Sequence, residues 1–357
     1  MIKKECFTAE WIEQVSSELH YNDKNLIEKV IRALSLLEML VKAGCPLVFK
    51  GGTALMLILG KSAHRLSIDI DLICPPGTNI EDYLKSFADF GFINLELVER
   101  KQRDDADIPK SHSKFFYQIA YRNDTDAQSY ILLDVLYEDI HYFRTQQIAI
   151  NCPFIRLEGK PLMVTVPSAE DILGDKLTAF APNTTGIPYY KNGRSCSMEI
   201  AKQLYDVGRL FENVSDLQIT KEAFRKIAVV ELSYRSFGTD IGQVFNDIRQ
   251  TALCISTRGK AGEGDFDLIQ DGIIRVKSFM YKQRYLIDHA IIDAARAAYL
   301  ATLIEKGINE IESYSNNPAD IKDMVILPSL PNKLNKLRSN LPEAYYYWAK
   351  TSELLEA

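Results

Sequence analysis

Residues 49–74, which read FKGGTALMLILGKSAHRLSIDIDLIC, constrain the fold more than any other part of the chain. A short apolar run ends in a Gly-Gly pair, an apolar segment of helical character follows, and a second apolar run contains Asp69 and Asp71. Because successive side chains of a strand point to opposite faces, a strand over 66–73 would place both aspartates on one face, roughly 6–7 Å apart. The order strand, glycine turn, helix, strand therefore predicts a sheet that carries paired carboxylates.

Paired carboxylates on an apolar strand repel each other and are costly to bury unless a cation neutralises them. Mg²⁺ takes oxygen ligands and commonly sits between one or two carboxylates and phosphate groups. We therefore predict a site for Mg²⁺ or Mn²⁺ at Asp69 and Asp71. The alternative is a pair of solvated surface residues, which the apolar neighbours disfavour. These neighbours are Leu66, Ile68, Ile70, Leu72 and Ile73.

A third carboxylate, Asp134, is the lone charge in the apolar run 130–137, which is predicted to be a strand. A charge in a buried strand is expensive unless it is paired. If its strand lies beside the strand of Asp69 and Asp71, the three acids form a cluster, with Asp134 as metal ligand or as general base. A salt bridge to an arginine in a structural core is the alternative.

The composition is that of a globular protein, with 46% hydrophobic and 25% charged residues. The formal net charge of −6 excludes a global basic field for nucleic acid but leaves room for a local patch. The six cysteines form no C-x-x-C pair, which disfavours a zinc site or a disulfide framework, and the five histidines show no metal-ligand spacing. No signal peptide is recognised and the apolar run 54–59 is too short for a membrane span, so we expect a cytoplasmic protein.

The pattern of elements changes near Pro167. Residues 1–166 are predicted to form an α/β lobe with N-terminal helices, and residues 167–357 a helical lobe, with a site in the cleft between them. Predicted strands cover 47–50, 66–73, 93–98, 115–121, 130–137 and 163–166. Predicted helices cover 11–43, 53–59, 80–90, 168–180, 199–211, 221–230, 266–280 and 285–304.

Two motifs of the first lobe, Gly51-Gly52-Thr53 and Arg65-x-Ser67-x-Asp69-x-Asp71-Leu72, resemble those of the DNA polymerase beta-like nucleotidyltransferase superfamily. More closely, the chain resembles the AbiEii/AbiGii family of bacterial toxins, which is related to the MenT toxins. Residues 174–180 look like the lysine motif of that family, and residues 204–207 like its final aspartate motif. The resemblance covers residues 45–215.

The resemblance implies an α+β fold, with a polymerase-beta-like lobe built on a mixed sheet and a helical lobe after it. It implies a magnesium-dependent enzyme that transfers NMP from an NTP to an acceptor such as the tRNA 3′ end and releases pyrophosphate. It also implies a toxin with a separately encoded antitoxin. A protein or small-molecule acceptor, or a non-catalytic nucleotide-binding module, are the alternatives.

By the same resemblance, the nucleotide would be bound by residues of both lobes. They are Gly51, Gly52, Thr53, Arg65, Ser67 and Lys176. Asp206 would position Lys176 or the acceptor. The alternatives are a surface Lys176, a helix-surface pair of Asp206 with Lys202, and an Arg65 that only neutralises the acids.

Two segments combine aromatic and basic residues, which suits base stacking and phosphate contacts in single-stranded RNA. They are Tyr189–Arg194 and Lys110–Lys114, the second followed by Phe115 and Phe116. Both are short, and a polar loop needs no ligand to explain it. We keep both segments as candidate contacts for an RNA acceptor.

Overall fold

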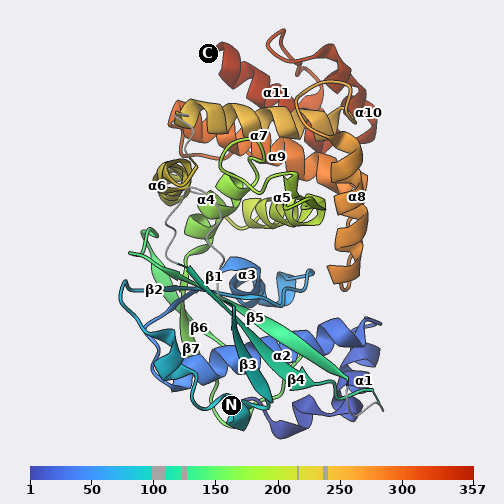
Figure 1. Cartoon of the computed structure of the whole chain (residues 1–357). Coiled ribbons are helices and arrows are strands. Elements are labelled where there is room, and N and C mark those ends of the chain that lie inside the picture. The colour runs from blue at the N-terminus through green and yellow to red at the C-terminus, as the bar shows by residue number, and fades with distance from the viewer. Residues whose placement is uncertain (99–109, 123–126, 215–216, 236–239) are drawn as a thin grey trace. The chain divides into compact units, whose positions relative to one another are not determined.

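The structure is a computed structural model that describes residues 1–98, 110–122, 127–214, 217–235 and 240–357 (Figure 1). The chain forms two compact units. The first comprises Met1–Ser168 and Ser278–Arg284, and the second Ala169–Lys277 and Tyr285–Ala357. The prediction has a single boundary near Pro167 and does not include the return of the short segment 278–284 to the first unit. This segment joins the first unit through contacts such as that of His64 Nδ1 with Gln283 Oε1 at 2.7 Å.

The first unit is built on a mixed five-stranded sheet of order β1-β2-β5-β4-β3. Strands β2 and β5 are parallel and the other neighbours are antiparallel. The elements are α1 (Ala9–Glu18), α2 (Lys24–Lys42), β1 (Val48–Lys50), α3 (Gly51–Leu59), β2 (Ile70–Cys74), β3 (Asn94–Val98), β4 (Lys110–Gln118), β5 (Gln128–Tyr137), β6 (Thr145–Ala149) and β7 (Met163–Pro167). Strands β6 and β7 form a separate antiparallel pair.

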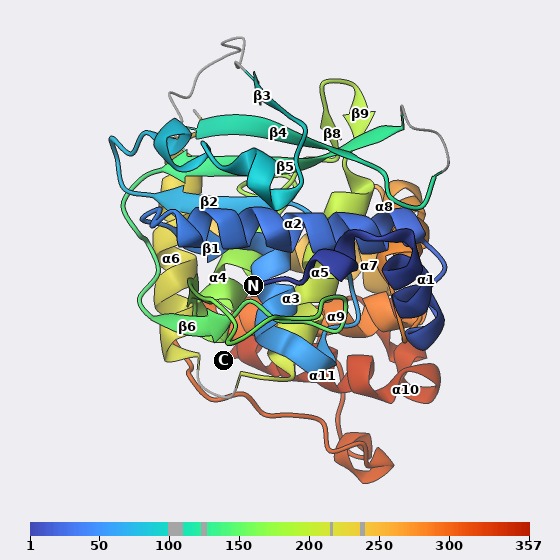
Figure 2. The same ribbon diagram turned by 90° about the horizontal axis from the view of Figure 1, so that it is seen from below.

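Helix α2 packs on one face of this sheet, along β2 and β5 (Figure 2). The strand residues that join α2 in the core alternate with half-buried ones, as expected when one face of a sheet is covered. They include Ile70 and Leu72 of β2, Ile131 and Leu133 of β5, and Phe115 and Tyr117 of β4. The intervening residues therefore lie on the opposite face, and these include Asp71 and Asp134.

Two predicted elements of the first unit are broken. The predicted helix over 11–43 is two helices, because His20 adopts a positive φ of 51° and Asp23 caps α2 by accepting a hydrogen bond from Leu26 N. The predicted helix over 80–90 consists of two 3₁₀ turns, Ile80–Tyr83 and Phe87–Phe90. Local apolar spacing does not distinguish one long helix from two short ones.

The second unit is largely helical. Its longer elements are α4 (Ala169–Ala179), α5 (Ser197–Phe211), α6 (Gln218–Ser233), α7 (Ile241–Ser256), α8 (Phe266–Val276), α9 (Ile287–Lys306), α10 (Leu337–Asn340) and α11 (Pro342–Glu356). Helix α9 is buried along most of its length and packs against α5, α7 and α11. A short hairpin of β8 (Tyr190–Lys191) and β9 (Arg194–Ser195) precedes α5.

The predicted α+β class is confirmed, since a mixed sheet with helices is followed by a helical region. Helices α7 and α11 are not among the predicted elements. Among the described residues, no helix combines the length and the apolar composition that a bilayer span requires.

Candidate active site

Four polar residues stand side by side across the sheet of the first unit. Lys50 of β1 is the register partner of Asp71 of β2, Asp71 is the partner of Asp134 of β5, and Asp134 is the partner of His112 of β4. Side chains that are directly opposite project from the same face and lie close together. We call these four residues the carboxylate row. It brings Asp71 and Asp134 together, as the sequence predicts, and it places a basic residue at each end.

Asp134 is less buried than its apolar strand predicts, because its side chain is 40% exposed. Oδ1 of Asp134 pairs with Nδ1 of His112 on the neighbouring strand. This pairing differs from the predicted alternative, in which an arginine of the core neutralises Asp134. The histidine partner was beyond prediction, since it depends on the register between β4 and β5.

The glycine turn packs directly against the carboxylate of Asp71. Gly51 has a φ of 79°, and a Cβ atom at this position would lie 2.1 Å from Oδ2 of Asp71. Only glycine is therefore compatible with both the backbone conformation and the close approach. The main-chain N–H groups at the start of α3 carry partial positive charge, which favours an anion at this place.

Arg65 and Ser67 lie at the same turn. A Cβ atom on Gly52 would be 2.7 Å from Oγ of Ser67 and 3.0 Å from Nη2 of Arg65. The Arg65 residue is 7% exposed, and its Nη1 donates to the carbonyl oxygen of Leu66 at 3.0 Å. The predicted nucleotide-binding residues of the first unit thus meet at the start of α3.

Thr53 and Asp69 differ from the predicted arrangement. Strand β2 begins at Ile70, so Asp69 lies just before the strand that carries Asp71 and outside its ladder. Thr53 is fully buried, and its hydroxyl donates to the carbonyl oxygen of Asp69 at 2.7 Å. This hydrogen bond fixes the chain just before β2. Contact of Thr53 with phosphate stays a prediction.

The donor set suits a hard cation that completes its coordination with substrate. In the described part of the chain, no group of three or more His, Cys, Asp or Glu side chains is arranged so that it could hold a metal ion. Mg²⁺, however, is usually held by one or two carboxylates together with substrate phosphates and water. Asp71 and Asp134, opposite each other in the register, offer two such carboxylates, and Asp69 lies two residues before Asp71 in the chain.

Lys176 and Asp206 form a buried ion pair in the second unit. Nζ of Lys176 on α4 lies 3.1 Å from Oδ2 of Asp206 on α5 and donates to Oε1 of Gln203 at 2.9 Å. The side chains of Lys176 and Asp206 are 9% and 2% exposed. The alternative of a surface lysine is therefore wrong, and Asp206 is not exposed on the surface of α5. An ammonium group has three N–H donors, so one remains for a further acceptor.

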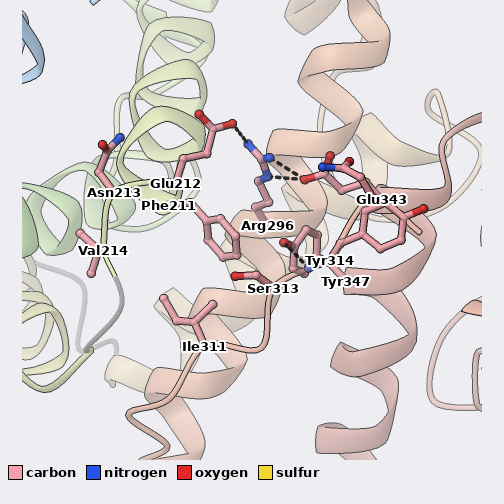
Figure 3. A pocket seen from close by; sticks show the side chains of 11 residues that line it. Phe211, Glu212, Asn213, Val214, Arg296, Ile311, Ser313, Tyr314, Glu343 and Tyr347 are labelled. Carbon is pink, nitrogen blue, oxygen red and sulfur yellow. Dashed lines mark hydrogen bonds and ion pairs between the residues drawn. The ribbon is translucent and has the colours of Figure 1, made fainter. Parts of the chain in front are cut away.

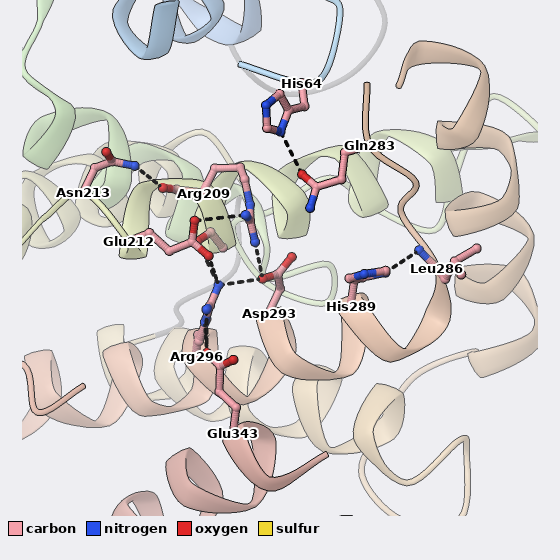
Figure 4. A network of polar contacts seen from close by, with 11 residues as sticks. His64, Arg209, Glu212, Asn213, Gln283, Leu286, His289, Asp293, Arg296 and Glu343 are labelled. Atoms are coloured by element: carbon pink, nitrogen blue, oxygen red, sulfur yellow. Dashed lines mark hydrogen bonds and ion pairs between the residues drawn. The ribbon is translucent and has the colours of Figure 1, made fainter. Parts of the chain in front are cut away.

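A larger ion network joins α5, α9 and α11 of the second unit (Figure 4). Asp293 is 1% exposed, and its Oδ1 lies 3.4 Å from Nη2 of Arg209 and 3.2 Å from Nη1 of Arg296. Arg296 also pairs with Glu212 at 2.9 Å and with Glu343. Burial raises the pKa of the Asp293 carboxyl, although both arginines oppose the shift. This network was not predicted, since its members come from distant helices.

A pocket of about 520 Å³ lies beside this network (Figure 3). Its lining combines the aromatic rings of Phe211, Tyr314 and Tyr347 with the charged groups of Arg296 and Glu343. None of the predicted site residues lines it. We therefore place the candidate active site at the carboxylate row and not at this pocket.

Comparisons with known proteins give the family. The sequence model described as "Nucleotidyl transferase AbiEii toxin, Type IV TA system" matches residues 34–307. No curated protein matches the chain.

Solved structures similar to the chain include the crystal structure of JHP933 from Helicobacter pylori, with 16% identity, coverage of 86% of this chain and 95% of that chain, and a TM-score of 0.38. They also include MenT4, the nucleotidyltransferase toxin Rv2826c from Mycobacterium tuberculosis H37Rv, with 13% identity, coverage of 82% and 89%, and a TM-score of 0.41. The family assignment depends on the sequence model alone, which spans the glycine turn, the carboxylate row, Lys176 and Asp206. The chain belongs to the AbiEii family of nucleotidyl transferase toxins of type IV toxin–antitoxin systems.

Proposed function

We propose that this nucleotidyltransferase toxin uses Mg²⁺ or Mn²⁺ to transfer NMP from an NTP to a hydroxyl of an RNA acceptor such as the tRNA 3′ end. The oxygen of the acceptor hydroxyl forms a bond to the α-phosphorus. The bond from that phosphorus to the β-phosphate oxygen breaks, and pyrophosphate leaves. The observation that carries the proposal is the direct opposition of Asp71 and Asp134 beside the glycine turn.

The carboxylates provide the oxygen ligands. A bound divalent ion would neutralise phosphate charge and polarise the reacting phosphoryl group. Asp69 and Asp71 hold this ion in our proposal. Asp134 either completes the ligand set or accepts the proton of the attacking hydroxyl. The two roles are separable, because Asp134→Asn would weaken metal binding in the first case and leave it intact in the second.

The turn at the start of α3 binds the triphosphate in this proposal. The N–H groups that follow Gly51 and Gly52 suit phosphate oxygens. Arg65, whose Nη2 lies at the same turn, adds a guanidinium that is always charged. Thr53 and Ser67 complete the set of predicted phosphate contacts.

Lys176 makes a separate contribution from the second unit. Asp206 and Gln203 fix its ammonium group through two of the three N–H donors. We propose that the remaining donor binds a phosphate oxygen of the nucleotide. Asp206 acts through Lys176 and is therefore a positioning residue.

The proposal is tested by incubating the full chain with each labelled NTP and, in separate reactions, purified tRNA, total RNA or protein from a bacterial lysate. We expect label in RNA, pyrophosphate in equal amount, and loss of both with Asp71→Asn. Label in the protein fraction would point to the alternative acceptor. Binding of NTP without pyrophosphate release under any condition would instead support a non-catalytic module.

A further inference from the structure

We infer that the exposed face of β4 and β5 next to the carboxylate row is a platform for single-stranded RNA that leads the acceptor end toward Asp134. This inference deepens the proposed function and rests on it. We call Phe116, Tyr130 and Lys114, together with Lys29 of α2, the sheet platform. All four belong to the first unit.

The sheet platform has an aromatic pair at its centre. Phe116 and Tyr130 are register partners on β4 and β5, and their ring centroids are 5.7 Å apart at an interplanar angle of 55°. Tyr130 is 40% exposed near the start of β5, where β5 pairs with β4 but lies beyond the end of β2. Every base has a π-face, so an exposed ring on a sheet is a sequence-tolerant stacking surface.

Two cations flank the exposed ring. Nζ of Lys114 lies 5.5 Å from the centroid of Tyr130, and Nζ of Lys29 lies 5.7 Å from it. Lys114 also pairs with Glu96 at 3.4 Å, with the two side chains 30% and 50% exposed. An ion pair with this exposure contributes little, so a phosphate can compete with Glu96 for Lys114. The combination of a stacking ring and cations matches the bases and the phosphates of a nucleic acid strand.

The register connects the platform to the candidate active site. Tyr130 and Asp134 are four residues apart on β5, so they share a face and are separated by roughly 13 Å. Lys114 and His112 have the same relation on β4, with a separation of two residues. A strand that stacks on Tyr130 can therefore present an end at Asp134 within a span of a few nucleotides.

The other aromatic and basic segment provides a matched comparison. Tyr190 is 58% exposed on the hairpin of β8 and β9, where Asn192 and Gly193 take the positive φ values of a tight turn. This hairpin belongs to the second unit and has no register relation to the carboxylates. We therefore assign the acceptor contact to the sheet platform and use the hairpin as control.

The experiment measures binding of a fluorescently labelled single-stranded RNA to the full chain by anisotropy, without NTP or metal. We expect Tyr130→Ala to raise Kd by roughly tenfold or more, since loss of one stacked base costs about 1–3 kcal/mol. Tyr130→Trp should bind as the wild type does, whereas Tyr130→Leu should resemble Tyr130→Ala. Tyr190→Ala should change Kd by less than about twofold.

Equal binding by Tyr130→Ala and the wild type, or equal binding by Tyr130→Leu and Tyr130→Trp, would overturn the platform. So would a wild-type chain that does not bind the RNA while it labels lysate protein, and in that case nucleotidyl transfer itself would stand. RNA binding that depends on Tyr130 without any NMP transfer would support the platform and contradict the proposed nucleotidyl transfer. Unfolding by urea is measured for each variant, so that a folding defect is not mistaken for a binding defect.

Discussion

The charges of the two units are arranged in opposite ways. In the second unit, Asp293 is almost fully buried and lies between Arg209 and Arg296, and Arg296 also pairs with Glu212 directly after α5 and with Glu343 on α11. In the first unit, Asp71 and Asp134 lie directly opposite each other, and Asp134 is 40% exposed. One group is an ion network with alternating signs, and the other brings two like charges together.

This difference separates a structural role from a functional one. A buried charge is costly unless opposite charges lie beside it, and the ion network supplies such charges from three helices. Like charges directly opposite in a sheet are destabilising, and Lys50 and His112 at the ends of the carboxylate row offset this repulsion in part. The contrast supports a structural role for the ion network, and it agrees with our proposal that the carboxylate row binds a ligand.

The largest expected effect is on activity at the carboxylate row. Asp71→Asn should lower NMP transfer by about 10³- to 10⁴-fold, because electrostatic stabilisation by a metal contributes several kcal/mol. Its stability should change little, because the repulsion from Asp134 is lost together with the attraction of Lys50, the register partner of Asp71 on β1. Transfer assays and urea unfolding of the same preparation test both statements. Asp82→Asn, at a side chain that is 60% exposed, is the control and should leave both unchanged.

The second effect is on stability at the ion network. Asp293→Ala should destabilise the protein by about 3–5 kcal/mol, because it leaves two buried arginines without their shared partner. The matched control is Asp271→Ala on α8, whose side chain is 55% exposed and pairs with Arg275. That pair should contribute about 0.3–0.5 kcal/mol. Similar unfolding midpoints for the two variants would refute a structural role for the ion network.

The third prediction concerns Lys176, which combines burial with a proposed ligand contact. Lys176→Met should lower transfer by roughly 10- to 100-fold, as expected for a lost hydrogen bond from a charged group, and should also destabilise the fold. The double variant Lys176→Met/Asp206→Leu removes both charges, so it should regain stability but not activity. Recovery of activity together with stability would show that Lys176 has only a structural role.

The smallest effect comes from two glycines with nearly the same backbone. Gly51 and Gly44 have φ values of 79° and 74°, but only at Gly51 would a Cβ atom meet the Asp71 carboxylate. Alanine at Gly44 should cost roughly 1–2 kcal/mol of stability through its backbone conformation. At Gly51 the clash with Asp71 should add to the same backbone cost. Only Gly51→Ala should also impair transfer, because Asp71 has to move. Equal transfer activity of the two variants would show that transfer does not depend on the position in which the glycine turn holds Asp71.

The sequence predicts those parts of the structure that depend on local pattern. The short strand before the glycine turn, the start of α3 and the approach of Asp134 to Asp71 follow from apolar runs interrupted by single charges. The break within the predicted helix over 11–43 does not, because it depends on a positive φ at His20. The start of β2 at Ile70 depends on strand pairing, which the alternation of 66–73 cannot locate.

The missed residues are those that the register or tertiary packing defines. His112 and Lys50 join the carboxylate row only because β4 and β1 pair with their neighbours at one particular offset. Arg209 joins Asp293 and Arg296 through the packing of α5 on α9, whereas the spacing of Asp293 and Arg296 on one helix is visible in the sequence. The pair of Lys176 with Asp206 was reached through family motifs and not through local pattern.

The most direct test of the account is metal-dependent nucleotide binding by calorimetry. The wild type and Asp71→Asn are titrated with each NTP in the presence and absence of Mg²⁺. We predict that Mg²⁺ strengthens nucleotide binding by the wild type and has no effect on binding by Asp71→Asn. An equal gain in affinity for both proteins would contradict the claim that Asp71 and its neighbouring carboxylates hold the ion.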